Sequence, residues 1–396
     1  MMKALPIFMH TFRKIIDFIR ETYREERKEI PLHSPVFGGN TKKYLLDCID
    51  STFVSSIGSY VDEFERKICE FTGARHAVAT VNGTAALHIA LILAGVKRDD
   101  EVITQAISFV ATTNAIRYCG AWPVFLDSDC STMGLSPEAL EAFLQTECRQ
   151  EKDACIYDKT TGRRISACVP MHVCGHPVRI ERIRELCRRF GIALVEDAAE
   201  SLGSFFNARH TGTFGRLGIF SFNGNKTITT GGGGMLLTDD EALAKRARHM
   251  TTTAKVSHPW RYYHDETGYN YRMPNINAAL GCAQMEMLPG FIESKRKLAA
   301  AYRDFFESIE VDFIAEPEGG RSNYWLNAIR LDNSAERDAF LAYSHERGVL
   351  SRSLWTLLSE LPMYSGCRRD ELINAGWLSE RVVNIPSGVI PGGVVQ

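Results

Sequence analysis

The stretch Ala77-Val78-Ala79-Thr80-Val81-Asn82-Gly83-Thr84 leads directly into a run of small and apolar residues that ends before Gly95. Residues 77–81 are typical of a short buried strand, Asn82-Gly83 of a tight turn, and residues 85–94 of a helix. The unpaired N–H groups and the dipole of such a helix make its N-terminus a general anion site. Asn-Gly turns and threonine caps are also common without ligands, so this turn alone does not establish a binding site.

The alternation of strands and helices continues along the chain. Further strands are predicted at 101–104, 123–127, 166–173 and 192–196, with helical segments between them. This spacing predicts an α/β fold with a mostly parallel, doubly wound sheet. Ligands bind such sheets at the carboxyl ends of the strands. Residues that follow predicted strands are therefore candidates for one shared site: Gly83, Thr84, Ser108, Phe109 and Asp197.

A lysine stands out in the stretch Gly218-Ile219-Phe220-Ser221-Phe222-Asn223-Gly224-Asn225-Lys226, which precedes four glycines at 231–234. A lysine beyond a short apolar strand, with hydroxyl groups before it and a flexible run after it, can form a Schiff base beside an anchored phosphate. It must react as the neutral amine, which desolvation or neighbouring cations favour. A P-loop does not fit, because Asn225 separates Gly224 from Lys226. The ordinary alternative is a lysine exposed to solvent on the surface. Only partner residues elsewhere in the chain can favour the Schiff-base interpretation over it.

Two acidic residues follow the predicted strand at 192–196, in the motif Glu196-Asp197-Ala198-Ala199-Glu200. An acid at the position of Asp197 either caps the next turn or keeps the ring nitrogen of a pyridine cofactor protonated. The motif alone leaves both interpretations open.

Two further segments are candidates for contact with a ligand. In His172-Val173-Cys174-Gly175-His176, alternate residues would share one face of a strand, as in some metal sites. No carboxylate accompanies the pair, so we expect a turn that lines the site and no metal. The aromatic and basic segment 259–274, with Arg261 and Tyr262, suits either a packed surface loop or an anionic ligand that carries a flat ring.

Length and composition set the class of protein. The 396 residues, 45% hydrophobic and 24% charged, predict a globular protein of two domains. A net charge of −2 argues against general affinity for nucleic acid or anionic membranes. The 11 scattered cysteines, without a C-x-x-C pair, predict reduced thiols and no disulfide framework. No apolar run approaches a membrane span and no signal peptide is evident, so a cytoplasmic location is expected.

The pattern also predicts how the chain divides. Residues 1–30 show helical spacing and predict an accessory helix, with a membrane-surface helix less favoured because acidic residues share its charged end. One helix is expected from Asn277 through Gln284, and a second after Pro289. We predict a large ligand-binding domain at 31–285, of which 31–58 could also pack with the small domain, and a smaller α+β domain at 286–396.

Four motifs occur in a fixed order: Asn82-Gly83-Thr84-Ala85-Ala86-Leu87, residues 196–200, residues 221–226, and Gly268-Tyr269-Asn270-Tyr271-Arg272. Together they resemble the sugar-nucleotide aminotransferases of pyridoxal 5′-phosphate (PLP) fold type I, the DegT/DnrJ/StrS family, over about residues 31–396. Within this family the chain looks most like the branch that acts on 4-keto-6-deoxy nucleotide sugars in the bacillosamine and legionaminic acid pathways. Gly38-Gly39-Asn40, residues 81–84 and residues 221–226 carry that finer likeness.

The resemblance implies catalytic roles for two residues. Lys226 would form the Schiff base with PLP and later move the proton between the substrate carbon and the cofactor, while Asp197 would hold the pyridinium nitrogen. Phe109 would stack on the ring. Glu200 stands where glutamine is common in the family, beside the phenolic oxygen of PLP. The lysine itself counts against the related sugar dehydratases, which carry histidine there.

The resemblance also implies how the phosphate is held and how the chain assembles. Gly83, Thr84 and Ser221 would bind the phosphate, and Asn270 would reach it from a neighbouring subunit. A homodimer with shared sites would then be necessary for activity.

The implied reaction moves an amino group from glutamate, through the pyridoxamine phosphate (PMP) form, to C4 of a nucleotide-linked 4-keto-6-deoxy sugar. UDP-4-keto-6-deoxy-N-acetylhexosamine is the expected substrate, for bacterial lipopolysaccharide or other surface polysaccharide, and a GDP-linked, perosamine-type sugar is the alternative. A regulatory module that binds PLP or a sugar nucleotide without catalysis is a second alternative. An NAD-dependent sugar enzyme is disfavoured, because no G-x-G-x-x-G follows the first strand. Substrate contacts are expected from His172, His176, Arg261 and Tyr262.

Overall fold

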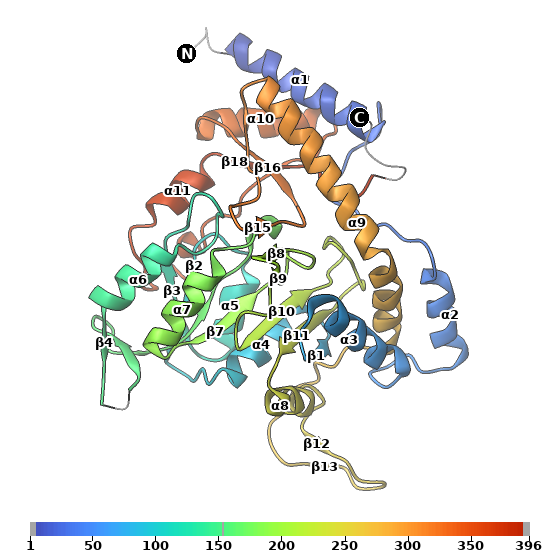
Figure 1. Ribbon diagram of the computed structural model, residues 1–396, viewed down its shortest axis with the longest axis vertical. Helices are drawn as coiled ribbons and strands as arrows, with labels where there is room; N and C mark the ends of the chain where they lie inside the picture. The colour runs from blue at the N-terminus through green and yellow to red at the C-terminus, as the bar shows by residue number, and fades with distance from the viewer. Residues whose placement is uncertain (1–4, 153, 391–396) are drawn as a thin grey trace.

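A large mixed sheet organises the computed structural model, which describes residues 5–390 except residue 153 (Figure 1). The main path of the sheet consists of these strands in spatial order: β1 (His76–Thr80), β11 (Gly234–Thr238), β10 (Leu217–Ser221), β7 (Ala193–Asp197), β6 (Arg164–Val169), β2 (Glu101–Gln105) and β3 (Trp122–Leu126). Neighbours from β10 to β3 are parallel, whereas β11 is antiparallel to both β1 and β10. The predicted α/β class is confirmed, and the antiparallel pairings lie at β1 and β11 on one side and at β4 (Cys148–Gln150) and β5 (Ile156–Asp158), which join β6, on the other.

Helices cover both faces of this sheet. Val102 of β2 packs in one apolar cluster with α4 (Gly83–Leu93), α5 (Ala111–Tyr118) and α8 (Glu241–Thr251). Its neighbour Ile103 points to the opposite face, in a cluster with α6 (Pro137–Thr146) and α7 (Ile180–Phe190). Successive residues of a strand face opposite sides, so a run buried on both faces reads as continuously apolar. The doubly wound arrangement is therefore visible residue by residue.

Two helical regions differ from the prediction. Between the predicted strands at 123–127 and 166–173, the helix α6 ends at Thr146, and Cys148–Gln150 forms an additional strand, β4, which pairs with β5 (Ile156–Asp158) at the sheet margin. The helix α9 (Asn275–Ser308) runs through Pro289 without the predicted break. Leu288, Phe291 and Ile292 are buried around the proline, so packing on both sides maintains the helix despite the lost hydrogen bond.

A second, four-stranded sheet lies beside the C-terminal half of α9 (Figure 1). Its strands are antiparallel, in the order β14 (Asp312–Phe313), β16 (Asn327–Arg330), β18 (Val382–Ile385) and β17 (Arg352–Ser353). The helices α10 (Ser334–Glu346) and α11 (Ile373–Ser379) accompany it. Short strands β8 (Phe205–Phe206), β9 (Arg209–His210) and β15 (Gly320–Arg321) form a third sheet that joins the two regions.

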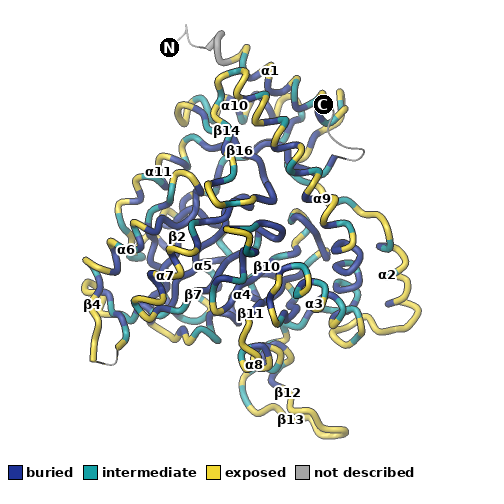
Figure 2. Tube along the Cα trace, in the orientation of Figure 1, coloured by how far each residue is buried: buried dark blue, intermediate teal, exposed yellow. Residues whose placement is uncertain are grey.

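The N-terminal helices lie against α9 and the second sheet. The helix α1 (Leu5–Tyr23) buries Phe12, Ile15, Ile16 and Ile19 in a cluster that includes Leu298 of α9 and Phe340 of α10, while its other face is exposed (Figure 2). The helices α2 (Thr41–Asp50) and α3 (Ser59–Thr72) also pack against α9. Within residues 5–390, apart from residue 153, no helix is long and apolar enough to cross a membrane.

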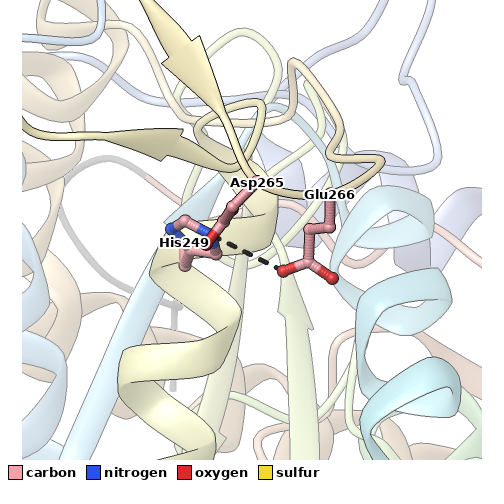
Figure 3. A group of neighbouring side chains, drawn as sticks. All are labelled: His249, Asp265 and Glu266. Carbon is pink, nitrogen blue, oxygen red and sulfur yellow. Dashed lines mark hydrogen bonds and ion pairs between the residues drawn. The ribbon is translucent and has the colours of Figure 1, made fainter.

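A two-stranded arm projects below α8 (Figures 1 and 2). It consists of β12 (Lys255–Val256) and β13 (Tyr263–His264), and its tip carries the highly exposed rings of Trp260 and Tyr262. At its base, His249 Nε2 lies 2.7 Å from Asp265 Oδ1 and 3.5 Å from Glu266 Oε1 (Figure 3). Arg246 forms two hydrogen bonds with Glu266, so this charged cluster ties the arm to α8.

Candidate active site

A cavity of about 310 Å³ lies at the carboxyl ends of β7 and β10, between the large sheet and the small one. These are the strand ends at which the sequence placed a ligand site. Seven of the predicted site residues line it: Gly83, Thr84, Phe109, Asp197, Glu200, Ser221 and Lys226. Side chains more than a hundred residues apart in the chain thus meet in one cavity.

Asp197 forms the buried acidic floor of the cavity. It ends β7, is almost fully buried, and accepts hydrogen bonds from Thr112 Oγ1 at 2.7 Å and from the backbone N–H of Ala199 at 3.2 Å. Burial raises the pKa of its carboxyl group, and these donors oppose that shift. A cation bound next to the carboxylate would favour the ionised form further.

Lys226 reaches the same cavity from the turn after β10. Its Nζ lies 3.1 Å from Glu200 Oε1 and 4.0 Å from the centroid of the Trp325 ring. Trp325 Nε1 donates to the carbonyl oxygen of Asn225 at 2.6 Å, which fixes the ring beside the lysine. The amine is therefore held by a carboxylate and an aromatic face and is not a solvated surface group.

Glu200 is buried behind the lysine. Its second oxygen accepts a hydrogen bond from the backbone N–H of Cys174 at 2.9 Å. Burial raises the pKa of its carboxyl group, whereas Lys226 lowers it. The carboxylate and the amine therefore form an ion pair that is largely shielded from water.

The start of α4 offers backbone donors to an anion. Asn82 caps the helix by accepting from the N–H of Ala85 at 2.7 Å, and this leaves the N–H groups of Gly83 and Thr84 without an intrahelical acceptor. A Cβ on Gly83 would lie 2.9 Å from Ser221 Cβ, so the absence of a side chain lets the helix start approach β10. Backbone N–H groups and two hydroxyl groups thus surround one point of the cavity wall.

The glycine run after Lys226 serves the same close approach. Gly232 and Gly233 line the cavity, and a Cβ on Gly234 would lie 2.3 Å from the carbonyl oxygen of Asn82. The absence of side chains at these positions allows β11 to pack directly against the turn that precedes α4. The run is part of the cavity wall and not only a connection.

This donor set fits PLP. The cradle at Gly83, Thr84 and Ser221 suits a phosphate, Asp197 suits a protonated ring nitrogen, and Lys226 supplies the amine. Asp197 thus supplies a negative charge for the protonated ring nitrogen. The N-terminus of α4 supplies a partial positive charge for the phosphate.

The structure places His172 and His176 away from the cavity. Both are completely buried and lie outside the cavity lining. His172 Nδ1 accepts from the N–H of Val178, and its Nε2 lies 3.2 Å from Glu196 Oε2. The turn Val173–Gly175 has positive φ at Cys174 and Gly175, and the two rings on either side of it are buried in the protein interior. Neither ring lines the cavity, so contact of His172 or His176 with substrate stays a prediction.

The segment 259–274 does not reach the cavity of its own chain. Arg261 and Tyr262 are exposed on the arm, and Asn270 is exposed beside α8, where its backbone bridges to Thr252. Their proposed contacts would therefore have to be made to another copy of the chain.

Several lining residues were not predicted. Thr112, Trp325, Arg352 and Trp355 all face the cavity. The motif Arg352-Ser353-Leu354-Trp355 has the same combination of arginine and aromatic ring that drew attention to 261–262, so it carried a usable signal. Thr112 lies in an ordinary helix, and only the fold shows that it contacts Asp197.

Fold and cavity together define a PLP-dependent enzyme of the aminotransferase class. The sequence profile of the DegT/DnrJ/EryC1/StrS aminotransferase family matches residues 36–390. The chain belongs to this family, and its cofactor is PLP. The match begins after α1, which therefore precedes the region shared with the family.

Individual relatives agree with this assignment. The chain is 36% identical to GDP-perosamine synthase of Escherichia coli O157:H7 over 362 residues, which cover 91% of this chain and 93% of the relative. It is 35% identical to GDP-perosamine synthase of Vibrio cholerae over 361 residues, covering 90% and 94%. Among solved structures, the aminotransferase TlmJ from Streptoalloteichus hindustanus aligns with a TM-score of 0.82 at 28% identity, covering 91% of this chain and 93% of TlmJ. DesI, determined with its TDP-sugar product, aligns at 0.80 and 27% identity, covering 95% and 92%.

Proposed function

We propose that the protein transfers an amino group from glutamate to C4 of a nucleotide-linked 4-keto-6-deoxy sugar, as a step in the biosynthesis of a bacterial surface polysaccharide. The observation that carries this proposal is the placement of Lys226 Nζ, 3.1 Å from Glu200 in a cavity that also holds the buried Asp197. Membership of the aminotransferase family supports the reaction class.

The residues of the cavity have separate roles in the reaction. When bound, PLP supplies an aldehyde carbon that takes up amines and a ring that accepts electrons. Asp197 keeps the ring nitrogen protonated, and Lys226 Nζ takes the proton from the donor carbon and returns one to the sugar carbon. Glu200 Oε1 holds Nζ in position, and the Trp325 ring restricts its movement.

Two sugar nucleotides are candidates. The likeness at residues 38–40, 81–84 and 221–226 favours UDP-4-keto-6-deoxy-N-acetylhexosamine. The two relatives at 35–36% identity are GDP-perosamine synthases, and this observation favours a GDP-linked 4-keto-6-deoxy sugar as the second candidate.

The proposal includes a homodimer in the cytoplasm. Asn270 is exposed and outside the cavity of its own chain, which agrees with a role in the cavity of a second subunit. All 11 cysteines are free thiols in this structure.

The test is a panel of UDP-, GDP- and dTDP-linked 4-keto-6-deoxy sugars with glutamate as donor, scored by mass spectrometry for amino-sugar product. We expect one nucleotide to give product, and the visible absorbance of the bound cofactor to bleach on addition of glutamate alone. An enzyme that bleaches with glutamate but aminates none of the sugars would refute the proposed substrate class. An enzyme that binds PLP and never bleaches would be a non-catalytic module.

A further inference from the structure

Arg352 is a charged residue of the cavity for which the roles assigned above provide no partner. The charged residues that line the cavity within the described chain are Asp197, Glu200, Lys226 and Arg352. Asp197 and Glu200 are the buried acids of the cavity, and Lys226 supplies the amine. Arg352 comes from β17 of the small sheet and thus from a different wall than the phosphate cradle at the start of α4.

The guanidinium group of Arg352 is unpaired. Among residues 5–390, apart from residue 153, its side chain makes no hydrogen bond and no salt bridge, and its Nε is buried without an acceptor. Other partly buried arginines are paired, such as Arg164 with Asp100, Arg272 with Glu65, and Arg296 with Glu316. A buried donor that lacks a partner costs free energy unless a ligand or water completes it.

The side chain is nevertheless held in a defined place. The backbone of Arg352 pairs with Asn384 in the adjacent strand, and its Cζ lies 5.5 Å from the centroid of the Trp355 ring, which also lines the cavity. Arg352 and Lys226 both act on the buried thiol of Cys174, whose pKa burial raises to about 12 and these two cations lower. The guanidinium and the amine therefore belong to the same small region.

A planar guanidinium with free N–H groups matches a carboxylate or a phosphate. The proposed reaction brings two such groups, the carboxylates of the amino donor and the diphosphate of the sugar nucleotide. The cavity measures about 310 Å³ and must also contain the cofactor, so a small amino acid fits beside Lys226 whereas a nucleotide extends beyond it. The volume thus favours the amino donor.

We propose that Arg352 and Trp355 form the subsite that binds a carboxylate of the amino donor. The inference rests on the proposed function and adds a specificity-determining residue to it. It places the acidic donor between the small sheet and Lys226, with its amine toward the lysine. Donors without a matching carboxylate would bind weakly.

The two half-reactions separate this role from binding of the sugar nucleotide. With the PLP form of the enzyme, stopped-flow absorbance gives the glutamate concentration for half-maximal bleaching. We expect Arg352→Met to raise it about 10- to 100-fold, the range for losing a charged hydrogen-bonded pair, and Arg352→Lys to raise it less. With the PMP form, the half-reaction with the keto sugar should stay within about twofold of wild type.

Three results would overturn the subsite: an unchanged response to glutamate, loss of the sugar half-reaction instead, or an equal loss of both. The second would assign Arg352 to the diphosphate. The control is Arg75→Met, which removes the same charge from an exposed position that does not line the cavity and should leave both half-reactions unchanged. Circular dichroism and PLP content, compared among all variants, identify any general folding defect.

A binding measurement tests the subsite without turnover. Glutarate carries both carboxylates of glutamate and no amine, so titration calorimetry with the PLP form reports carboxylate binding alone. Wild type should bind glutarate, and Arg352→Met should bind it about 10- to 100-fold more weakly. Equal binding by the two proteins would refute the subsite even if the proposed aminotransfer were correct. Wild type that never bleaches with glutamate would refute the proposed function, and the glutarate comparison would still decide the role of Arg352.

Discussion

Lys226 and Glu200 show how burial converts ordinary residues into reactive ones. Either residue on a surface would be fully ionised and solvated. In the cavity, burial raises the pKa of the Glu200 carboxyl group, while the ammonium group of Lys226 at 3.1 Å lowers it. Trp325 adds a ring at 4.0 Å that excludes water from one side of the amine. The chemistry is therefore a property of the pair and its enclosure.

Replacing the lysine tests this pair directly. Lys226→Ala should lower kcat for amino-sugar formation at least about 10³-fold, because Lys226 is the only lysine among the described residues that line the cavity. PLP should still bind through the phosphate cradle and Asp197, but without the absorbance of a covalent adduct. Lys297→Ala, at an exposed position of α9 that does not line the cavity, is the matched control and should retain activity. Full activity in Lys226→Ala would remove this residue from the mechanism.

The buried histidines predict a loss of stability in acid. Burial lowers the pKa of His176 to about 4 and that of His210 to about 4. The unfolded chain takes up these protons near pH 6.5, whereas the folded protein takes them up only near pH 4. Between pH 6.5 and 4 the unfolded state therefore binds more protons than the folded state. As the pH falls through this range, the free energy of unfolding decreases by about 1.4 kcal/mol per pH unit for each histidine.

His176→Phe isolates one of these contributions. Both ring nitrogens of His176 lack hydrogen-bond partners among the described residues, and its ring meets Tyr324 edge to face, so phenylalanine should be tolerated. Urea titrations between pH 7.5 and 4.5 give the free energy of unfolding at each pH. As the pH falls, this free energy should decrease less in the variant than in wild type, and the difference should equal the contribution of one histidine. His10→Phe, at an exposed position, should follow the wild-type curve. Identical curves for all three proteins would show that His176 does not titrate as inferred.

Among the elements, the start of α4 depends on glycines in two neighbouring segments. Gly83 permits the helix to approach Ser221, and Gly234 permits β11 to approach Asn82. The N–H groups that face the cavity are useful only if nothing stands between them and the anion. The glycines therefore set the backbone distances at this site, in addition to leaving N–H groups free for hydrogen bonds.

Gly83→Ala should weaken PLP binding about tenfold or more. The new Cβ would lie 2.9 Å from Ser221 Cβ and 3.4 Å from the carbonyl oxygen of Phe220, so the helix start or the serine must shift away from the phosphate. Equilibrium dialysis with PLP measures the dissociation constant. Gly376→Ala, where a Cβ meets nothing within 4 Å, should leave it unchanged. An unchanged constant in Gly83→Ala would mean that the phosphate does not bind at this helix.

For the molecule as a whole, the proposed dimer makes each cavity depend on two chains. The exposed arm projects below α8 (Figure 1), and neither the arm nor the exposed Asn270 lines the cavity of its own chain. If Asn270 completes the phosphate site of a second subunit, neither chain alone can be active. The assembly would then be part of the catalytic apparatus.

Mixed dimers test this dependence. Asn270→Glu would place a negative charge beside the phosphate and should inactivate the homodimer, as should Lys226→Ala. When the two inactive proteins are mixed and allowed to exchange subunits, a hybrid contains one cavity with both native residues. Activity should rise from near zero to about a quarter of wild type for random exchange, since half of the dimers then carry one competent cavity. No recovery, despite hybrids detected by native mass spectrometry, would place Asn270 in its own subunit's function.

The short apolar strands, the glycine turn at Asn82-Gly83-Thr84 and the order of the four motifs determined by themselves the α/β class, the family and most of the cavity wall. Those features are local, because a strand or a helix start depends on residues within a few positions. The passage of α9 through Pro289, the burial of His172 and His176 and the approach of Arg352 to the cavity were decided only by tertiary structure. Each depends on packing between segments far apart in the chain. Apolar neighbours maintain the helix at Pro289, and the turn at Cys174 and Gly175 lies between the two buried histidine rings. The second sheet places Arg352 in the same cavity as Lys226.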